Sequence, residues 1–128
     1  MFYDVSLSVP SLTLEAAPVS VLVGVSAGVV SRVSVMFPPG CAGLVHVRIF
    51  RSSHQVWPSN LDGSFASDGE RIEFQEDYSV MDAPFEFRIV AWNDDDTFQH
   101  TVGVRLGILP EIRVVGLPKW LTRLLGRV

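Results

Sequence analysis

Hydrophobic and polar residues alternate with a period of two along most of the chain. The stretch FYDVSLSV, for example, places Tyr3, Val5, Leu7 and Val9 on one face and polar residues on the other. This period is typical of strands with one buried face. The same alternation predicts further strands at 19–25, 29–37, 43–51, 70–75, 84–92 and 97–109, with short candidates at 54–57 and 111–115.

The alternation also predicts which side chains face the core. In 29–37 we expect Val29, Val33, Val35 and Phe37 to point inward. Because SAG (26–28) separates 19–25 from 29–37 and is rich in turn-forming residues, these two segments are expected to pair as a hairpin. The inward faces of the last two long segments contain Phe85, Phe87, Ile89 and Ala91, and Phe98, His100, Val102, Val104, Leu106 and Ile108.

Short strands joined by turns, without long helices, predict an all-β fold. The pattern favours an antiparallel β-sandwich of seven to eight strands, immunoglobulin-like or jelly-roll-like. Cys41 is the only cysteine, so the cysteine pair of antibody domains is absent and the strand order stays open. We expect Cys41 to be an unreactive buried or loop thiol, because no charged neighbour in PPGCAG would lower its pKa.

The pattern changes at Leu117, which divides the chain into a predicted sandwich, 1–116, and a tail, 117–128. Pro118 suits the first turn of a helix. Spacings of three and four residues then predict a short amphipathic helix. Its apolar positions are Trp120, Leu121, Leu124, Leu125 and Val128, and its cationic stripe is Lys119, Arg123 and Arg127.

Charge is distributed unevenly between these two parts. Residues 1–109 hold six arginines and thirteen acidic residues, a net charge of −7, whereas 110–128 hold four basic residues and one acidic, a net charge of +3. The overall charge of −4 argues against a nucleic-acid partner. The tail residues are predicted to bind a neighbouring subunit, another copy or a different protein; packing on its own sandwich and binding an anionic membrane are the alternatives.

The acidic run Asp94–Asp96 is the most conspicuous candidate for chemistry. It separates two predicted strands, and Asn and Asp are common in turns, so a hairpin turn is the favoured interpretation. The EF-hand pattern does not fit, because no glutamate stands at the required position. A looser calcium site would need Asp62 or Asp68 from another loop.

Other catalytic or cofactor signatures are weak. His46 lies on an outward position and His100 on an inward one, without the spacing of a zinc site. No serine stands in a nucleophile motif, and the acidic Glu73, Glu76 and Asp77 define no hydrolase pair. We therefore expect no cofactor. The first residues also lack the pattern of a secretory signal, and the apolar run 19–30 is too short and too rich in glycine and serine for a membrane span.

Aromatic residues in loops or on outward positions raise a second possibility. Trp57, beside His54 and Asn60, is a candidate platform for a sugar ring, and Phe50 and Trp92 also fall on outward positions. The strand-and-turn pattern resembles many interaction sandwiches, among them decoration proteins of viral capsids and modules of surface layers. That resemblance implies a non-catalytic accessory, cement or decoration subunit. The alternatives are a carbohydrate-binding module using Trp57 and a hydrolase.

Overall fold

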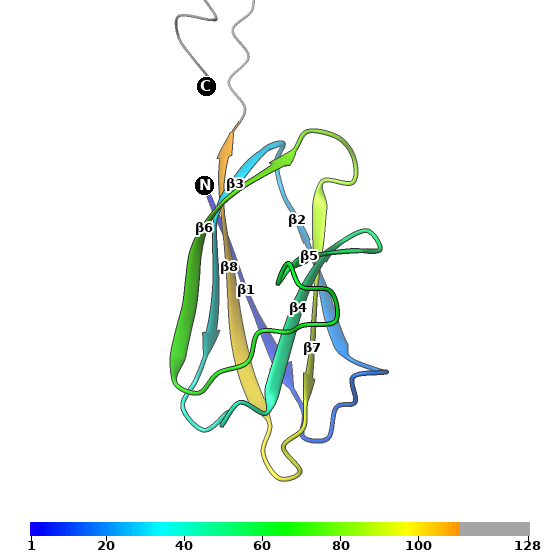
Figure 1. Ribbon diagram of the computed structural model, residues 1–128, viewed down its shortest axis with the longest axis vertical. Helices are drawn as coiled ribbons and strands as arrows, with labels where there is room; N and C mark the ends of the chain where they lie inside the picture. The colour runs from blue at the N-terminus through cyan, green and yellow to red at the C-terminus, as the bar shows by residue number, and fades with distance from the viewer. Residues whose placement is uncertain (111–128) are drawn as a thin grey trace, which may run out of the picture.

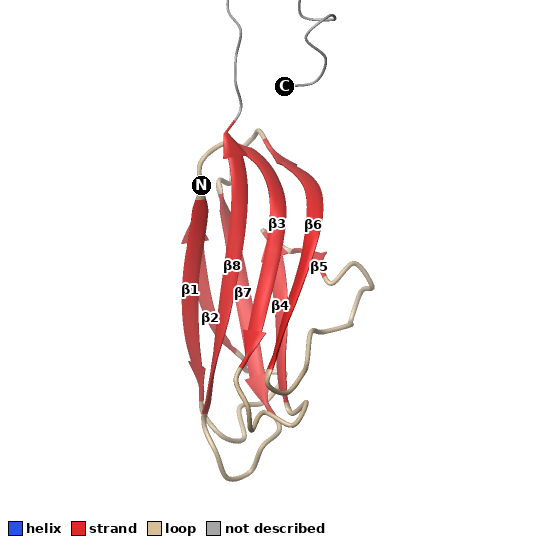
Figure 2. Cartoon of the chain, turned by 90° about the vertical axis from the view of Figure 1, so that its left-hand side faces the viewer, coloured by secondary structure: helices blue, strands red, loops and turns tan. Residues whose placement is uncertain are grey.

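The computed structural model describes residues 1–110, which form two antiparallel four-stranded sheets packed face to face (Figures 1 and 2). One sheet has the order β1 (Phe2–Val9), β8 (His100–Pro110), β3 (Gly28–Phe37), β6 (Glu70–Val80). The other has the order β2 (Val19–Gly24), β7 (Glu86–Asn93), β4 (Val45–Arg51), β5 (His54–Trp57). The predicted all-β antiparallel sandwich is confirmed. The predicted strand 111–115 and the amphipathic helix lie outside the described residues.

The predicted hairpin between β2 and β3 is wrong, because these strands belong to different sheets. β2 pairs with β7, whereas β3 lies between β6 and β8. Gly28, which we assigned to a turn, is the first residue of β3 and pairs with Pro110. A Cβ at Gly28 would stand 2.3 Å from the carbonyl oxygen of Leu109, so glycine permits this close approach of β3 to β8.

The register of β3 changes at a bulge between Val30 and Arg32, which is visible in its pairing with both neighbours. Val30 is therefore fully buried and Val29 is not, contrary to our expectation. Beyond the bulge, Val33, Val35 and Phe37 point inward as predicted. An extra residue in a strand shifts every earlier side chain to the opposite face.

The predicted registers of β7 and β8 are confirmed within the strands and wrong just before them. Phe87, Ile89 and Ala91 are fully buried and Arg88 is exposed. Phe85 and Phe98, by contrast, are exposed, because β7 begins at Glu86 and β8 at His100. Outside a strand the backbone no longer holds the period of two.

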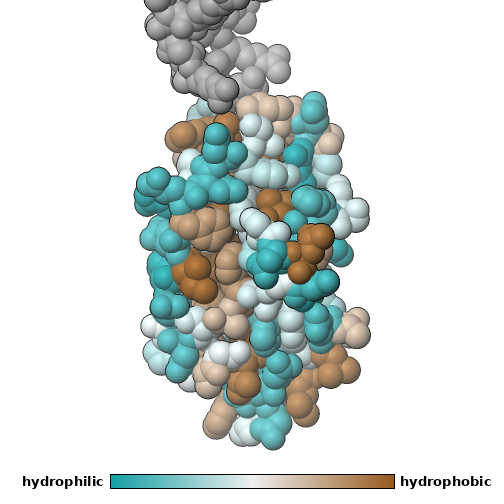
Figure 3. Space-filling model, viewed as in Figure 1, coloured by the Kyte–Doolittle hydropathy of each residue, from teal (hydrophilic) through white to brown (hydrophobic). Residues whose placement is uncertain are grey.

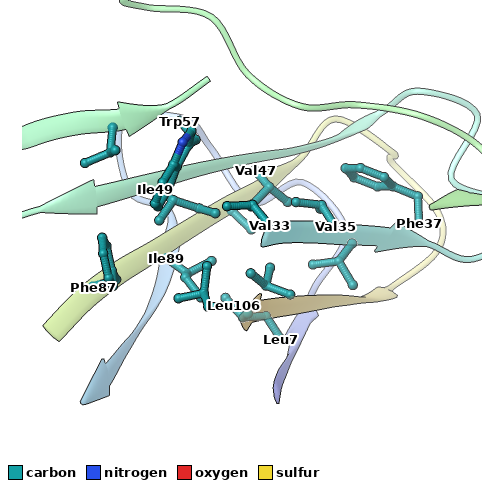
Figure 4. Close-up of a cluster of buried hydrophobic side chains, with 14 of the residues drawn as sticks. Leu7, Val33, Val35, Phe37, Val47, Ile49, Trp57, Phe87, Ile89 and Leu106 are labelled. Carbon is teal, nitrogen blue, oxygen red and sulfur yellow. The ribbon is translucent and has the colours of Figure 1, made fainter. Parts of the chain in front are cut away.

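The core fills the space between the sheets (Figure 4). It contains buried side chains from seven strands, and the partly buried Val19, Val21 and Val23 of β2 pack against it. Its largest member is Trp57, which is 2% exposed. The indole packs against Tyr78 and Phe87, with ring centroids 5.4 and 5.5 Å away, and its Nε1–H donates to Glu76 Oε1 at 3.3 Å. Trp57 is thus a core residue whose polar atom has a partner at the edge of the sandwich.

Candidate functional site

Four loop segments meet at the end of the sandwich opposite Pro110, and we call this region the acidic end (Figure 1). It consists of 10–18, 38–44, 66–70 and 94–99. Backbone hydrogen bonds join them: Leu12 N–H donates to Asp95 O at 2.9 Å, Asp94 N–H to Leu44 O at 2.9 Å, and Gly43 N–H to Ser67 O at 3.3 Å. The region is therefore one connected surface.

The β7–β8 connection in this region is a turn stabilised by its own side chains. The buried Asn93 accepts from Asp95 N–H at 2.9 Å, and its Nδ2 donates to Val9 O at 3.1 Å and Phe98 O at 3.0 Å. Asp95 Oδ1 accepts from the amides of Thr97 at 2.9 Å and Phe98 at 3.2 Å. These bonds are typical of Asx-turns, so the predicted turn is confirmed. The predicted hairpin is wrong, because β7 and β8 belong to different sheets and the turn crosses from one sheet to the other.

Asp95 is also bound to the core side of β8. Its Oδ2 lies 2.8 Å from His100 Nε2, and both side chains are buried. The hydrogen bond from His100, and then those from the amides of Thr97 and Phe98, lower the pKa of Asp95. His100 is thus a partnered inward histidine, in agreement with its predicted orientation.

The looser calcium site is not assembled within residues 1–110. Asp94 binds His46, and Asp68 accepts from Gly40 N–H at 2.8 Å. In this part of the chain no group of three or more histidine, cysteine or acidic side chains is arranged to hold a metal ion. Within the described residues, the carboxylates of the turn therefore serve hydrogen bonds rather than a metal.

His46 links three segments on the outer face of the β2–β7–β4–β5 sheet. Its ring stacks on Trp92, with centroids 5.0 Å apart and planes 8° apart. Nδ1 lies 2.8 Å from Ser64 Oγ, and Nε2 lies 3.0 Å from Asp94 Oδ2. Ser64 lies in the aperiodic loop after β5 and belongs to no sequence motif, so sequence analysis missed this group of three residues.

A serine–histidine–aspartate chain is the arrangement that activates a serine nucleophile. With Nε2–H donating to the carboxylate of Asp94, Nδ1 of a neutral His46 accepts the Ser64 hydroxyl proton. However, the amides on both sides of Ser64 are engaged: Gly63 N–H donates to Asn60 O and Phe65 N–H to Val47 O, both at 2.9 Å. These two amides are not available to stabilise an oxyanion. The contacts of His46 join β4 to the loop that carries Ser64 and to the β7–β8 turn.

Arg48 strengthens the same link. Its guanidinium lies 4.6 Å from the Trp92 ring centroid and pairs with Glu15 at 3.0 Å. It also donates to the carbonyl oxygens of Gly63 at 2.7 Å and Asp62 at 2.6 Å. Trp92 is on the outward face as predicted, but His46 and Arg48 cover it and it is buried. Phe50, the third outward aromatic, is half-buried beside Arg88.

The predicted sugar platform is wrong with respect to Trp57, because that ring is enclosed in the core (Figure 4). His54 and Asn60 are exposed. His54 does line an open hollow of about 380 Å³, together with Phe50, Leu61 and Asp62, but Trp57 does not line it. The structure therefore does not bring the three predicted residues together as one aromatic binding surface.

Cys41 is buried, as one of the predicted alternatives required. Burial, and then the negative charges of Asp68 and Asp95, raise the pKa of its thiol. A thiol with a raised pKa is a poor nucleophile, so Cys41 is a packing residue.

Exposed apolar side chains accompany the carboxylates of the acidic end. Figure 3 shows hydrophobic surface among hydrophilic surface at this end of the molecule. The apolar residues are Leu12, Leu14, Leu44 and Phe98. The carboxylates are Glu15, Asp68, Glu70, Asp94, Asp95 and Asp96, and the four segments contain neither lysine nor arginine.

No family model and no curated protein matches this chain. Residues 1–110 contain no helix long and apolar enough to cross a membrane. The predicted partner-binding residues lie outside the described part of the chain. They are Lys119, Trp120, Leu121, Arg123, Leu124, Leu125 and Arg127.

Proposed function

We propose that this protein is a non-catalytic structural module, an accessory or cement-type subunit of a larger assembly such as a viral capsid. In this proposal the sandwich is a rigid body and residues 117–128 anchor it to a neighbouring subunit. The observation that carries the proposal is the separation of charge, −7 over residues 1–109 against +3 over residues 110–128. A cationic, apolar segment is attracted to acidic protein surfaces and can bury its apolar residues against them.

The organisation of the body supports this proposal. Among residues 1–110 every buried polar side-chain atom has a hydrogen-bond partner, so the sandwich is well suited to serve as a preformed block. His46, His100 and Asp95 are held in hydrogen bonds, and the flanking amides of Ser64 are engaged. We therefore propose that the protein recognises its partner through its surface. The tail contains tryptophan and arginine, which are enriched at protein interfaces.

The test follows the full-length chain in the cells that express it. Their extracts are separated on a density gradient, and the chain is located with an antibody. We expect the wild-type chain in fractions far heavier than its own 14.1 kDa, at a fixed ratio to another component. The matched variant, which we call the tail variant, carries Lys119→Glu, Arg123→Glu and Arg127→Glu and is expected in the light fractions. Equal sedimentation of both chains as free monomers would refute the proposal.

A further inference from the structure

We propose that the tail of one copy binds the acidic end of a second copy, so that the protein associates head to tail. This inference rests on the proposed role of residues 117–128 as an anchor and names the surface that receives them. The receiving surface is the acidic end, with Leu14 and Phe98 as its most exposed apolar residues, 66% and 64%.

The acidic end offers both kinds of group that the tail requires. Asp68, Glu70 and Asp96 form no salt bridge within residues 1–110, and they are exposed. Leu12 is joined to the Asp94–Asp96 turn by its backbone hydrogen bond to Asp95. The cationic stripe of the tail would thus pair with the carboxylates of the acidic end. The apolar side chains of the tail and of the acidic end would be buried against each other on contact.

The acidic end is also distinctive among the surfaces of the body. Arginines stand on both sheets outside it, at Arg32, Arg51, Arg71, Arg88 and Arg105. Arg105 pairs with Asp4 at 3.2 Å and Arg32 with Glu73 at 3.6 Å. In the four segments of the acidic end such cations are absent, although Arg71 directly follows Glu70 and Arg48 pairs with Glu15. The carboxylates of these segments therefore attract a cationic segment.

Chain geometry favours contact between copies over contact within one copy. The tail follows Pro110, at the opposite end of β8 from the acidic end (Figure 1). The eleven residues of β8 extend on the order of 35 Å. Residues 111–116 reach at most about 21 Å, and the helix that the sequence predicts over 117–128 would add about 18 Å. If that predicted helix forms, folding back would bring only its last turn to its own acidic end, and not Lys119 or Trp120.

A head-to-tail contact uses two different surfaces, so it is a heterologous interface. Such an interface propagates into rings or filaments, because each copy keeps one free surface of each kind. Mixing one variant that has a defective tail with another that has a defective acidic end should therefore stop growth at a dimer. A copy without a working tail and a copy without a working acidic end still form one contact with each other, and growth stops at a dimer.

The experiment uses purified full-length chains in sedimentation-velocity runs over a range of concentrations at low salt. The end variant carries Leu14→Ser and Phe98→Ser. The control variant carries Leu22→Ser and Phe85→Ser, which are exposed by 60% and 40% near the other end of the sandwich. We expect wild type and the control variant to associate beyond the dimer. The tail variant alone and the end variant alone should each associate at least about tenfold more weakly than wild type. Their 1:1 mixture should form dimers of twice 14.1 kDa.

The outcomes separate this inference from the proposed function. If the tail variant fails to associate and the end variant associates like wild type, the tail is an anchor but the acidic end is not its target, and the inference is overturned. A wild-type chain that stays monomeric at every concentration also overturns it, whereas the gradient experiment on cell extracts still decides the proposed function. Equal melting temperatures of all variants exclude unfolding as the cause.

Discussion

At the scale of single residues, Asp95 connects the β7–β8 turn to the core through His100. Since its pKa is lowered in the folded protein, it adds stability above its unfolded pKa of about 3.9, and that contribution is lost as the pH falls through the lower folded pKa. We expect Asp95→Asn to melt at a lower temperature than wild type at pH 7, and this difference should shrink as the pH falls below about 3.9. Thermal melts over a series of pH values from 7 downward measure this; Asp96→Asn, which lacks a histidine partner, is the control. A constant difference across the range would contradict the assignment.

Ser64 provides a second residue-scale prediction. Because the amides beside it are already hydrogen-bonded, we expect no reaction with a fluorophosphonate probe at pH 7–8. Ser64→Ala should lower the free energy of unfolding by about 1 kcal/mol through loss of the bond to His46. Mass spectrometry after labelling and denaturant titration measure the two effects. Labelling of Ser64 that disappears in His46→Ala would show a nucleophile instead of a structural link.

These residues also show what sequence could and could not predict at this scale. The turn at Asn93–Asp96 was predictable, because the side chains bond to backbone only a few residues away. The contact of His46 with Ser64 was not, because Ser64 belongs to a loop without a period and the contact depends on how that loop folds over β4. Trp57 was misplaced for a related reason: a single aromatic residue beside a proline carries no information on which way it points.

At the scale of elements, the pattern predicted the strands well and their partners poorly. Alternation records which face of a strand is buried, so Phe87 and Leu106 were placed correctly. It does not record the neighbouring strand, so β2 and β3 were paired wrongly. The bulge at Ser31 was also missed, since one inserted residue leaves only a single break in the period.

Gly28 makes the pairing of β3 with β8 testable. Because a Cβ there would stand 2.3 Å from the carbonyl oxygen of Leu109, Gly28→Ala must push the strands apart. We expect it to lower the free energy of unfolding by about 1–3 kcal/mol in denaturant titration. Gly24→Ala in β2 is the matched control, since nothing lies within 4 Å of its Cβ position. Equal stability of the two variants would contradict the close approach of β3 to β8.

At the scale of the whole molecule, the two ends of the sandwich differ. The acidic end lies at one end of the sandwich, and Pro110, which precedes the cationic residues in the sequence, lies at the other (Figure 1). The sequence revealed the charge difference between body and tail but not the gathering of carboxylates at one end. That gathering arises because four loops distant in the sequence meet there. Salt should weaken any contact that this charge difference drives, because the groups are exposed.

We expect the sandwich to fold independently of the tail. The core cluster extends from Leu7 to Ile108, and the eight strands that the structure describes lie within residues 2–110. We therefore expect a chain ending at residue 116 to keep the β-type circular dichroism and the cooperative melting of the full chain, with a melting temperature within a few degrees. Its association in sedimentation runs should be lost. If removal of 117–128 instead unfolds the sandwich while the intact chain remains monomeric, the tail packs on its own body. If the intact chain, but not the shortened one, sediments with anionic liposomes, the tail binds membranes.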